Sequence, residues 1–154
     1  MALTSANSIN IARWMPQMFY FLFAYKQLKS KNKPIVFSVP SGNFGNICAG
    51  MLAQKLGFPF AHFIASNNAN NVVERYFKTN TYSPLPSIQT ISNAMDVGNP
   101  SNFVRIQKLH RYFIRGVPVK LVKVPRLFLV ESSAGIPISK QPLHDPGVLL
   151  VQLL

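Results

Sequence analysis

A short strand that runs into a glycine-bracketed turn and then into a helix constrains the fold of this chain more than any other feature. The stretch extends from Pro34 to Ile47 and reads PIVFSVPSGNFGNI. Gly42 and Gly45 let the backbone turn tightly and approach a ligand without a Cβ atom in the way. The helix that follows offers unpaired N–H groups and the positive end of its dipole. The pattern predicts a phosphate-binding turn, although an ordinary strand-to-helix connection has the same local signals.

The elements around this turn predict an α/β fold. Ile35–Val39 and Phe60–Ala65 are β-branched and aromatic, which is typical of buried strands. Between them, Ile47–Leu56 is predicted to be a helix that Gly57 ends. Because such βαβ units place their strands in parallel, we expect a partial parallel sheet with ligands at the carboxyl ends of its strands.

Three further helices are expected from capping residues and apolar spacing. The first follows the cap-rich segment Thr4–Ser8 and is expected to bend at Pro16. A short helix is predicted over Val72–Phe77, and a longer one begins with Asn99 as the cap and Pro100 as the first helical residue. The apolar residues on one face of this last helix are Phe103, Ile106 and Leu109.

The chain is strongly basic, with 16 Lys and Arg residues against four acidic residues and a net charge of +12. Such an excess is typical of proteins that bind nucleic acid, an anionic membrane or an anionic ligand. The most concentrated basic side chains are Lys26, Lys29, Lys31 and Lys33. No base-stacking or groove-reading motif accompanies them, so a solvated loop is the preferred interpretation. Steeply salt-dependent binding to DNA would favour the alternative, a basic module that contacts nucleic acid through these lysines and the C-terminal tail.

Cysteine, histidine and apolar runs exclude several classes of site. The single cysteine, Cys48, excludes an internal disulfide and is expected to be a packed small residue. The three histidines have no zinc-ligand spacing, and His62 is expected in the core or at its rim. Met18–Tyr25 is too short to cross a membrane, and the N-terminus has no signal-peptide pattern. We therefore expect a cytoplasmic protein without a metal site. The polar run Asn67–Asn71 is expected to be a solvated loop rather than a ligand site.

The composition and the hydrophobic pattern of the sequence change after Leu109. Residues 110–154 are rich in proline and contain apolar runs without helical or strand boundaries. Residues 108–154 carry seven basic and two acidic residues, a net charge of +5, whereas residues 1–107 carry nine and two, a net charge of +7. We therefore divide the chain into residues 1–109 and a divergent basic tail, 110–154. A shifted reading frame or gene decay is the hypothesis for the tail, which the coding DNA would test.

Three motifs stand in order along the first segment. They are LTSANSINIAR at Leu3–Arg13, VPSGNFGN at Val39–Asn46 and SNAMDVGNPSNF at Ser92–Phe103. Together they resemble the threonine synthase family of pyridoxal-phosphate enzymes, which have the tryptophan-synthase-β-like fold, also named fold type II. The resemblance covers roughly residues 2–109 and corresponds to an internal portion of the family's length.

The resemblance implies the conversion of O-phosphohomoserine and water to threonine and phosphate, with pyridoxal phosphate as cofactor. It also implies two groups of binding residues. The cofactor phosphate would be held by Gly42, Asn43, Phe44, Gly45 and Asn46, with Asn43 also near the substrate phosphate. The substrate phosphate would be held by Asn7, Ser8 and Arg13, whose amide, hydroxyl and guanidinium groups suit an anion.

No catalytic residue is assigned in this chain. The lysine that forms the Schiff base in the family lies upstream of the first motif, and Lys78, although locally similar, falls in the wrong order. The partner of the pyridine nitrogen has no recognisable match in the tail. The resemblance therefore implies a fragment that is inactive alone and needs the remainder of its full-length chain. A phospho-lyase of the same family is the alternative, because it needs the same phosphate-binding turn.

Overall fold

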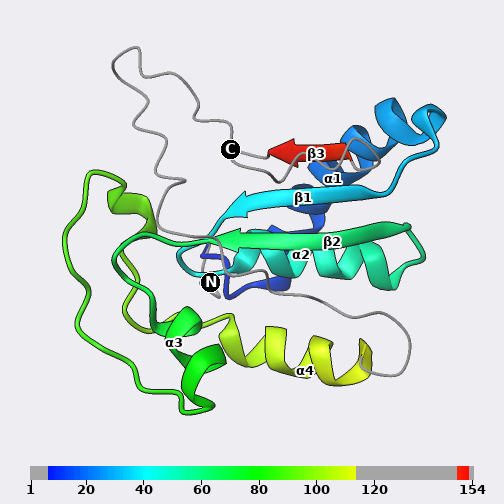
Figure 1. Ribbon diagram of the computed structural model, residues 1–154. Helices are drawn as coiled ribbons and strands as arrows, with labels where there is room; N and C mark the ends of the chain where they lie inside the picture. Colours follow the sequence, from blue (N-terminus) through cyan, green and yellow to red (C-terminus); the bar gives the residue numbers. More distant parts are fainter. Residues whose placement is uncertain (1–6, 114–148, 153–154) are drawn as a thin grey trace, which may run out of the picture.

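The computed structural model describes residues 7–113 and 149–152, which form a parallel sheet covered by helices (Figure 1). The strands are β1 (Ile35–Pro40), β2 (Phe60–Ser66) and β3 (Leu149–Gln152), in the order β2-β1-β3. Both neighbours of β1 pair with it in parallel. The predicted α/β fold with a partial parallel sheet is therefore confirmed.

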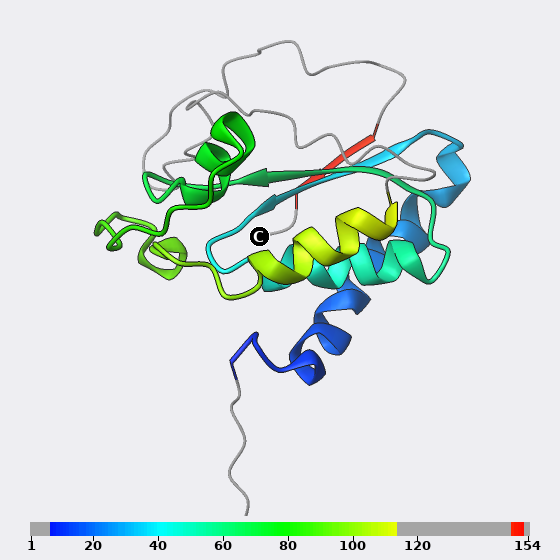
Figure 2. The ribbon, with the colours of Figure 1, turned by 90° about the horizontal axis from the view of Figure 1, so that it is seen from below.

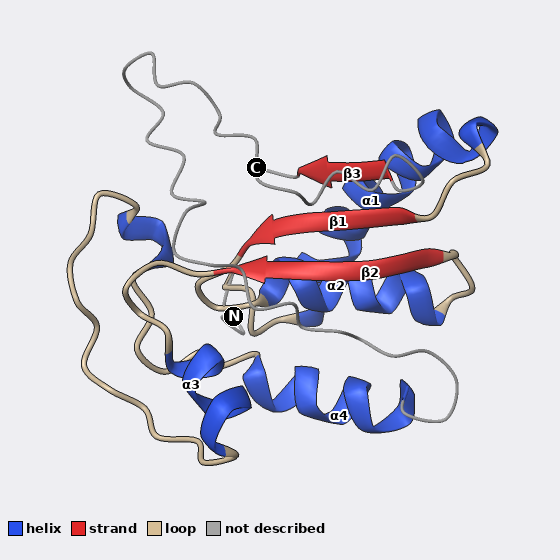
Figure 3. Ribbon diagram, viewed as in Figure 1, coloured by secondary structure: helices blue, strands red, loops and turns tan. Residues whose placement is uncertain are grey.

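The described residues include four α-helices, which pack beside the sheet and beyond its end (Figure 3). They are α1 (Trp14–Leu28), α2 (Gly45–Lys55), α3 (Val72–Thr79) and α4 (Phe103–Phe113), and the shorter 3-10 helices are η1 (Ile11–Arg13), η2 (Lys29–Lys31) and η3 (Asn93–Met95). Figure 2 shows α1, α2 and α4 on one side of the sheet. None of the helices within the described residues combines the length and the hydropathy that crossing a membrane requires.

An aromatic cluster fills the space between the sheet and the helices. The ring of Phe37, from β1, lies with its centroid 4.9 Å from that of Phe60 and 5.0 Å from that of Phe21 in α1. Phe63 joins them at 5.8 Å from Phe21. These edge-to-face contacts bury large apolar side chains, which provides the main driving force for folding. They fix α1, the central strand β1 and its neighbour β2 relative to one another.

Helix α2 ends as the sequence predicts. Gly57 adopts φ of 101°, a left-handed conformation that glycine reaches without strain. Its N–H donates to the carbonyl of Gln54, and the N–H of Phe58 donates to that of Ala53. This pair of bonds is a Schellman motif. It turns the chain directly into β2.

The helical boundaries near two prolines differ from the expectation. The segment predicted as one helix from Ile9 is divided into η1 and α1, and Pro16 lies in the first turn of α1, where its missing N–H breaks no helical bond. Helix α4 begins at Phe103 rather than at Pro100. The Asn102 carbonyl accepts the N–H of Ile106, so Asn102, and not Asn99, occupies the cap position.

Strand β3 lies in the segment for which the sequence indicates no regular structure. Leu149 to Gln152 pair in register with Ile35 to Ser38, and the N–H of Leu149 donates to the carbonyl of Pro34. The open edge of β1 thus orders a short apolar run whose own pattern is ambiguous. Helix α4 continues past the predicted boundary at residue 109. The division of the chain and the origin of the tail stay predictions, and residues 114–148 lie outside the described residues.

Candidate phosphate-binding site

The predicted turn lies at the carboxyl end of β1, beside the end of β2. The N–H of Ser41 donates to the carbonyl of Ser66 at 2.8 Å, which joins the two strand ends. The side chain of Asn46 closes the turn, because its Nδ2 donates to the Pro40 carbonyl at 2.7 Å and its Oδ1 accepts the N–H of Ile47 at 2.9 Å. The hydroxyl of Ser41 donates to the same oxygen. The Asn46 side chain therefore holds the turn in shape. The backbone N–H of Asn46, rather than the side chain, is left to contact a ligand.

Phe44 reverses the chain at the start of α2. It adopts φ of 63°, in the left-handed region that a bulky residue rarely visits. A conformation of this kind costs about 1–3 kcal/mol and persists only where the surroundings impose it. Burial of the Phe44 ring supplies that constraint. The backbone carbonyl of Phe44 also accepts a hydrogen bond from the N–H of Cys48 at 3.0 Å. Strain at this position indicates a turn that is shaped for more than chain connection.

The backbone N–H groups from Gly42 to Asn46 are available to a ligand. Within the described part of the chain, no residue accepts a hydrogen bond from any of them. They stand at the N-terminus of α2, where the helix dipole favours negative charge. A cluster of unpaired donors at a helix start fits a phosphate group, and therefore the phosphate of pyridoxal phosphate.

Both glycines of the turn are also needed for packing. A Cβ atom on Gly42 would lie 2.7 Å from Met95 Cα, and one on Gly45 would lie 2.7 Å from Ser8 Cβ. Real Cβ atoms do not approach other atoms so closely. The turn is therefore pressed between the segment before η1 and the segment of η3, which belong to the first and third sequence motifs.

The structure brings Ser8 to the turn. Its hydroxyl oxygen accepts hydrogen bonds from Nδ2 of Asn43 at 3.1 Å and from Nδ2 of Asn102 at 3.3 Å. The same hydroxyl donates to Oδ1 of Asn7 at 3.2 Å. Asn7 is exposed beside it, and Arg13 is exposed at the end of η1. Ser8 thus adjoins the turn through Asn43, and Asn7 lies beside Ser8. That Asn7, Ser8 and Arg13 hold a substrate phosphate stays a prediction.

Four residues of this region were not singled out from the sequence. The N–H and hydroxyl of Ser101 both donate to Oδ1 of Asn43, at 2.6 and 2.9 Å. Arg105 donates to Oδ1 of Asn102 at 2.7 Å and to the carbonyl of Ile9 at 2.9 Å. Its guanidinium lies 5.4 Å from the centre of the Trp14 ring. Ser101 and Asn102 stand in the third motif, which is a usable signal, but no sequence signal identifies Trp14 or Arg105.

The asparagine-rich loop after β2 is not the solvated loop that the sequence suggests. Oδ1 of Asp96 accepts Nδ2 of Asn68 at 2.7 Å and Nδ2 of Asn70 at 3.1 Å. Thr90 donates to Asp96 through both its hydroxyl and its N–H. The hydrogen bond from the Thr90 hydroxyl lowers the pKa of Asp96. The loop is ordered because its amides satisfy a carboxylate 26 or more residues away.

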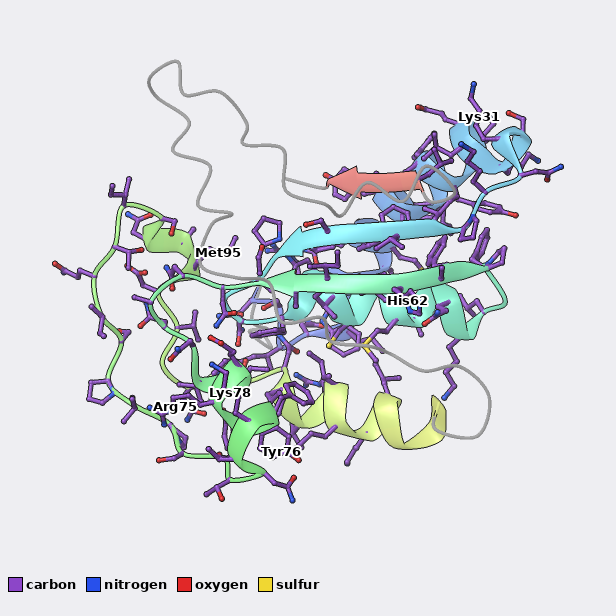
Figure 4. All side chains as sticks on the ribbon, in the orientation of Figure 1. Lys31, His62, Arg75, Tyr76, Lys78 and Met95 are labelled. Atoms are coloured by element: carbon purple, nitrogen blue, oxygen red, sulfur yellow. The ribbon has the colours of Figure 1, made fainter. Side chains whose placement is uncertain are left out.

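The remaining candidates have structural roles. Cys48 is fully buried, and this burial raises the pKa of its thiol to about 12, so it is a packed residue as predicted. His62 lies half-buried on β2, and Lys78 forms an ion pair of 2.5 Å with Glu74 on α3 (Figure 4). Among the described residues there is no group of His, Cys, Asp and Glu side chains that could hold a metal ion.

Comparisons with known proteins identify relatives of this chain. No model of a protein family matches it. Threonine synthase from Haemophilus influenzae is 49% identical over 110 residues, which are 71% of this chain and 26% of that protein. Threonine synthase from Escherichia coli is 46% identical over 112 residues, or 72% of this chain and 26% of that protein.

Comparison with solved structures identifies the same kind of protein. The crystal structure of E. coli threonine synthase superposes with a TM-score of 0.69 and covers 73% of this chain and 26% of its own. A structure of threonine synthase from Brucella melitensis, described as bound to pyridoxal phosphate, gives a TM-score of 0.63 at 30% identity and covers 97% of this chain and 32% of its own.

These matches share the fold with this chain and a sequence identity far above chance. This chain spans about a quarter of the length of the curated relatives it matches. Over 71% of its length, the chain is therefore a homologue of the threonine synthases.

Proposed function

We propose that this chain is the phosphate-binding part of a pyridoxal-phosphate-dependent threonine synthase, which converts O-phosphohomoserine and water to threonine and phosphate. The observation that carries the proposal is the set of unpaired N–H groups from Gly42 to Asn46 at the start of α2, directly beside Ser8. The homology to threonine synthases supports it, as does the description of the Brucella relative as bound to pyridoxal phosphate. A cytoplasmic location is part of the same proposal.

Two anion sites follow from this assignment. The N–H groups of Gly42, Asn43, Phe44, Gly45 and Asn46 would hold the cofactor phosphate, and Asn7, Ser8 and Arg13 would hold the substrate phosphate. Hydrogen bonds to a charged group contribute about 1.5–3 kcal/mol each. The bound cofactor supplies an electron sink for carbanion chemistry. The residues of this chain orient it and the leaving phosphate.

We further propose that the remainder of a threonine synthase polypeptide completes the active site and supplies the Schiff-base lysine. The relatives are about four times as long as the matched part. An uncovered apolar stripe on η1 and α1 supports this proposal, because such side chains are normally buried. Its members are four residues apart and more than half exposed: Ile11, Met15, Phe19 and Phe23.

A chimera tests the binding function separately from the missing parts. Residues 2–109 would replace the matched segment of E. coli threonine synthase, and threonine and phosphate would be measured after addition of pyridoxal phosphate and O-phosphohomoserine. We expect both products in equal amounts, and a loss of both on Ser8→Ala but not on Lys31→Ala, an exposed control. A folded chimera that binds no pyridoxal phosphate would contradict the proposal. Phosphate release without threonine would identify the phospho-lyase instead.

The 154-residue chain provides the complementary test. It would be incubated with pyridoxal phosphate, reduced with borohydride and digested to map any labelled lysine. We expect no stoichiometric adduct and no threonine. Labelling of one lysine together with threonine formation would refute the proposal that the chain needs a partner segment.

A further inference from the structure

Two side-chain amides converge on the hydroxyl of Ser8, that of the fully buried Asn102 and that of the half-buried Asn43, and their orientations are set by groups that can only donate. Oδ1 of Asn102 accepts from the guanidinium of Arg105 at 2.7 Å, and a guanidinium can only donate. Oδ1 of Asn43 accepts from the backbone N–H of Ser101 at 2.6 Å, which also can only donate. Each amide must therefore turn its NH₂ group toward Ser8.

This arrangement leaves the Ser8 hydroxyl a single role. A hydroxyl has two acceptor positions and one donor proton. Asn43 and Asn102 fill the acceptor positions, at 3.1 and 3.3 Å. The proton is left to point away from both amides, and here it is donated to Oδ1 of the exposed residue Asn7. A phosphate oxygen at the same place would accept it in the same way.

Several contacts hold Asn102 and the backbone of Ser8 in place. Asn102 is fully buried at the start of α4. Arg105, one turn later, reaches both Asn102 and the carbonyl of Ile9, and stacks on Trp14, whose Nε1 donates to the carbonyl of Ser8 at 2.8 Å. The backbone of Ser8 is thus held by the same group of side chains that orients its hydroxyl. Donors arranged in advance bind an anion without the cost of ordering them.

We infer that Asn102, oriented by Arg105, is a positioning residue that makes the Ser8 hydroxyl a dedicated donor to a bound phosphate. The inference rests on the proposed function, because it assigns the direction of a hydrogen bond within the proposed substrate-phosphate site. The substitution Asn102→Asp reverses that direction. It keeps the partner of Arg105 but presents an oxygen to Ser8, which turns the serine proton inward and removes it from the ligand.

A double-mutant cycle on the full 154-residue chain tests this inference. Pyridoxal phosphate would be added first, and inorganic phosphate would then be titrated while the amide signals of Ser8 and of the Asn102 side chain are followed by NMR. We expect N102D and S8A each to weaken phosphate binding by about tenfold or more, and the double variant to bind no more weakly than S8A. Asn93→Asp is the control, since it adds the same charge at an exposed position, and should change the affinity less than about twofold.

Several outcomes would overturn the inference. It is wrong if N102D weakens phosphate binding equally with and without the Ser8 hydroxyl, if N102D has no effect, or if the unaltered chain does not bind phosphate. Because a buried substitution can prevent folding, S8A without ligand gives a second test: it should shift the side-chain NH₂ signals of both Asn43 and Asn102, and unchanged signals would contradict the inference. The affinity for pyridoxal phosphate, measured separately, reports on the proposed function instead.

Discussion

The backbone of Gly42 packs directly against the backbone of Met95. A Cβ atom on Gly42 would lie 2.7 Å from Met95 Cα and 3.0 Å from its carbonyl oxygen. Figure 4 shows Met95 in the segment that carries η3, beyond the carboxyl ends of the strands. Because the facing atoms are backbone atoms, no side-chain rotation relieves a clash. The turn from Gly42 to Asn46, proposed to bind phosphate, is therefore shaped by a segment that lies some 50 residues further along the chain.

Gly42→Ala should therefore destabilise the protein and displace the turn. Overpacking of a closely packed site typically costs about 1–3 kcal/mol. We expect a decrease of this size in the free energy of unfolding in urea, together with weaker binding of pyridoxal phosphate in an absorbance titration. Met95→Ala is the matched control, because it leaves Met95 Cα and its carbonyl in place and should not rescue G42A. Wild-type stability in G42A would show that the contact is not tight.

Gly50, in the middle of α2, offers a prediction about the core. In an exposed helix, alanine is favoured over glycine by about 1 kcal/mol. Here a Cβ atom would lie 2.6 Å from the Phe63 ring and 2.7 Å from the Phe21 ring, both of which are buried. We expect Gly50→Ala to lower the free energy of unfolding by about 1–3 kcal/mol, measured by urea denaturation.

The companion variant for Gly50 is Phe21→Leu, which removes part of the obstructing ring. The double variant F21L/G50A should be more stable than the sum of the single changes, because the leucine leaves room for the new methyl group. Strict additivity, or a G50A variant more stable than the wild type, would mean that the rings yield and that helix propensity dominates.

The sheet and the turn are predictable because their signals are local. The apolar run Ile35–Val39 is bounded by turn residues, and Gly57 has the left-handed conformation that its position after a helix predicts. Strand β3 is different, since its short apolar run becomes a strand only through pairing with β1. Residues far apart in the sequence determine that pairing, so the local sequence of the run does not predict a strand.

The candidate site likewise has some residues that local sequence signals predict and others that only distant contacts determine. Gly42 and Gly45 indicate a phosphate-binding turn without help from any other segment, whereas Ser8 enters only through the family resemblance. The sequence places the start of α4 too early because two asparagines compete as caps, and the contacts of Asn102 with Ser8 and Arg105 decide between them. Since Ser8 and Asn102 are 94 residues apart, sequence spacing carries no information about their contact.

Cys48 should be unreactive while the protein is folded. Burial in α2 raises the pKa of its thiol to about 12, although Arg105 opposes part of this effect, so almost no thiolate exists at pH 8. We expect iodoacetamide to modify the native protein slowly and the urea-unfolded protein rapidly. The chain has one cysteine, so mass spectrometry of the modified protein reports on this position alone. Equal rates in the two states would contradict the buried placement.

Asp96 should make the stability of the protein depend on pH. Its carboxylate accepts hydrogen bonds from Asn68, Asn70 and Thr90, and the Thr90 hydroxyl is the main cause that holds its pKa below the usual value of 3.8. A lowered pKa in the folded state means that the ionised form favours folding. This stabilisation is fully present above pH 3.8 and is lost as the pH falls through the lower, folded-state pKa.

Asp96→Asn therefore separates this carboxylate from the rest of the acid response. At pH 7 the variant should unfold at a lower urea concentration than the wild type, because an amide cannot accept all of these hydrogen bonds, and the difference should shrink as the pH is lowered below 3.8. Glu74→Gln is the control, because it removes a carboxylate outside the Asp96 cluster: Glu74 pairs with Lys78 one turn away on α3, and such a half-exposed ion pair is worth about 0.3–0.5 kcal/mol. If D96N and the wild type differ by the same amount at pH 7 and pH 3, the carboxylate does not order the loop through its charge.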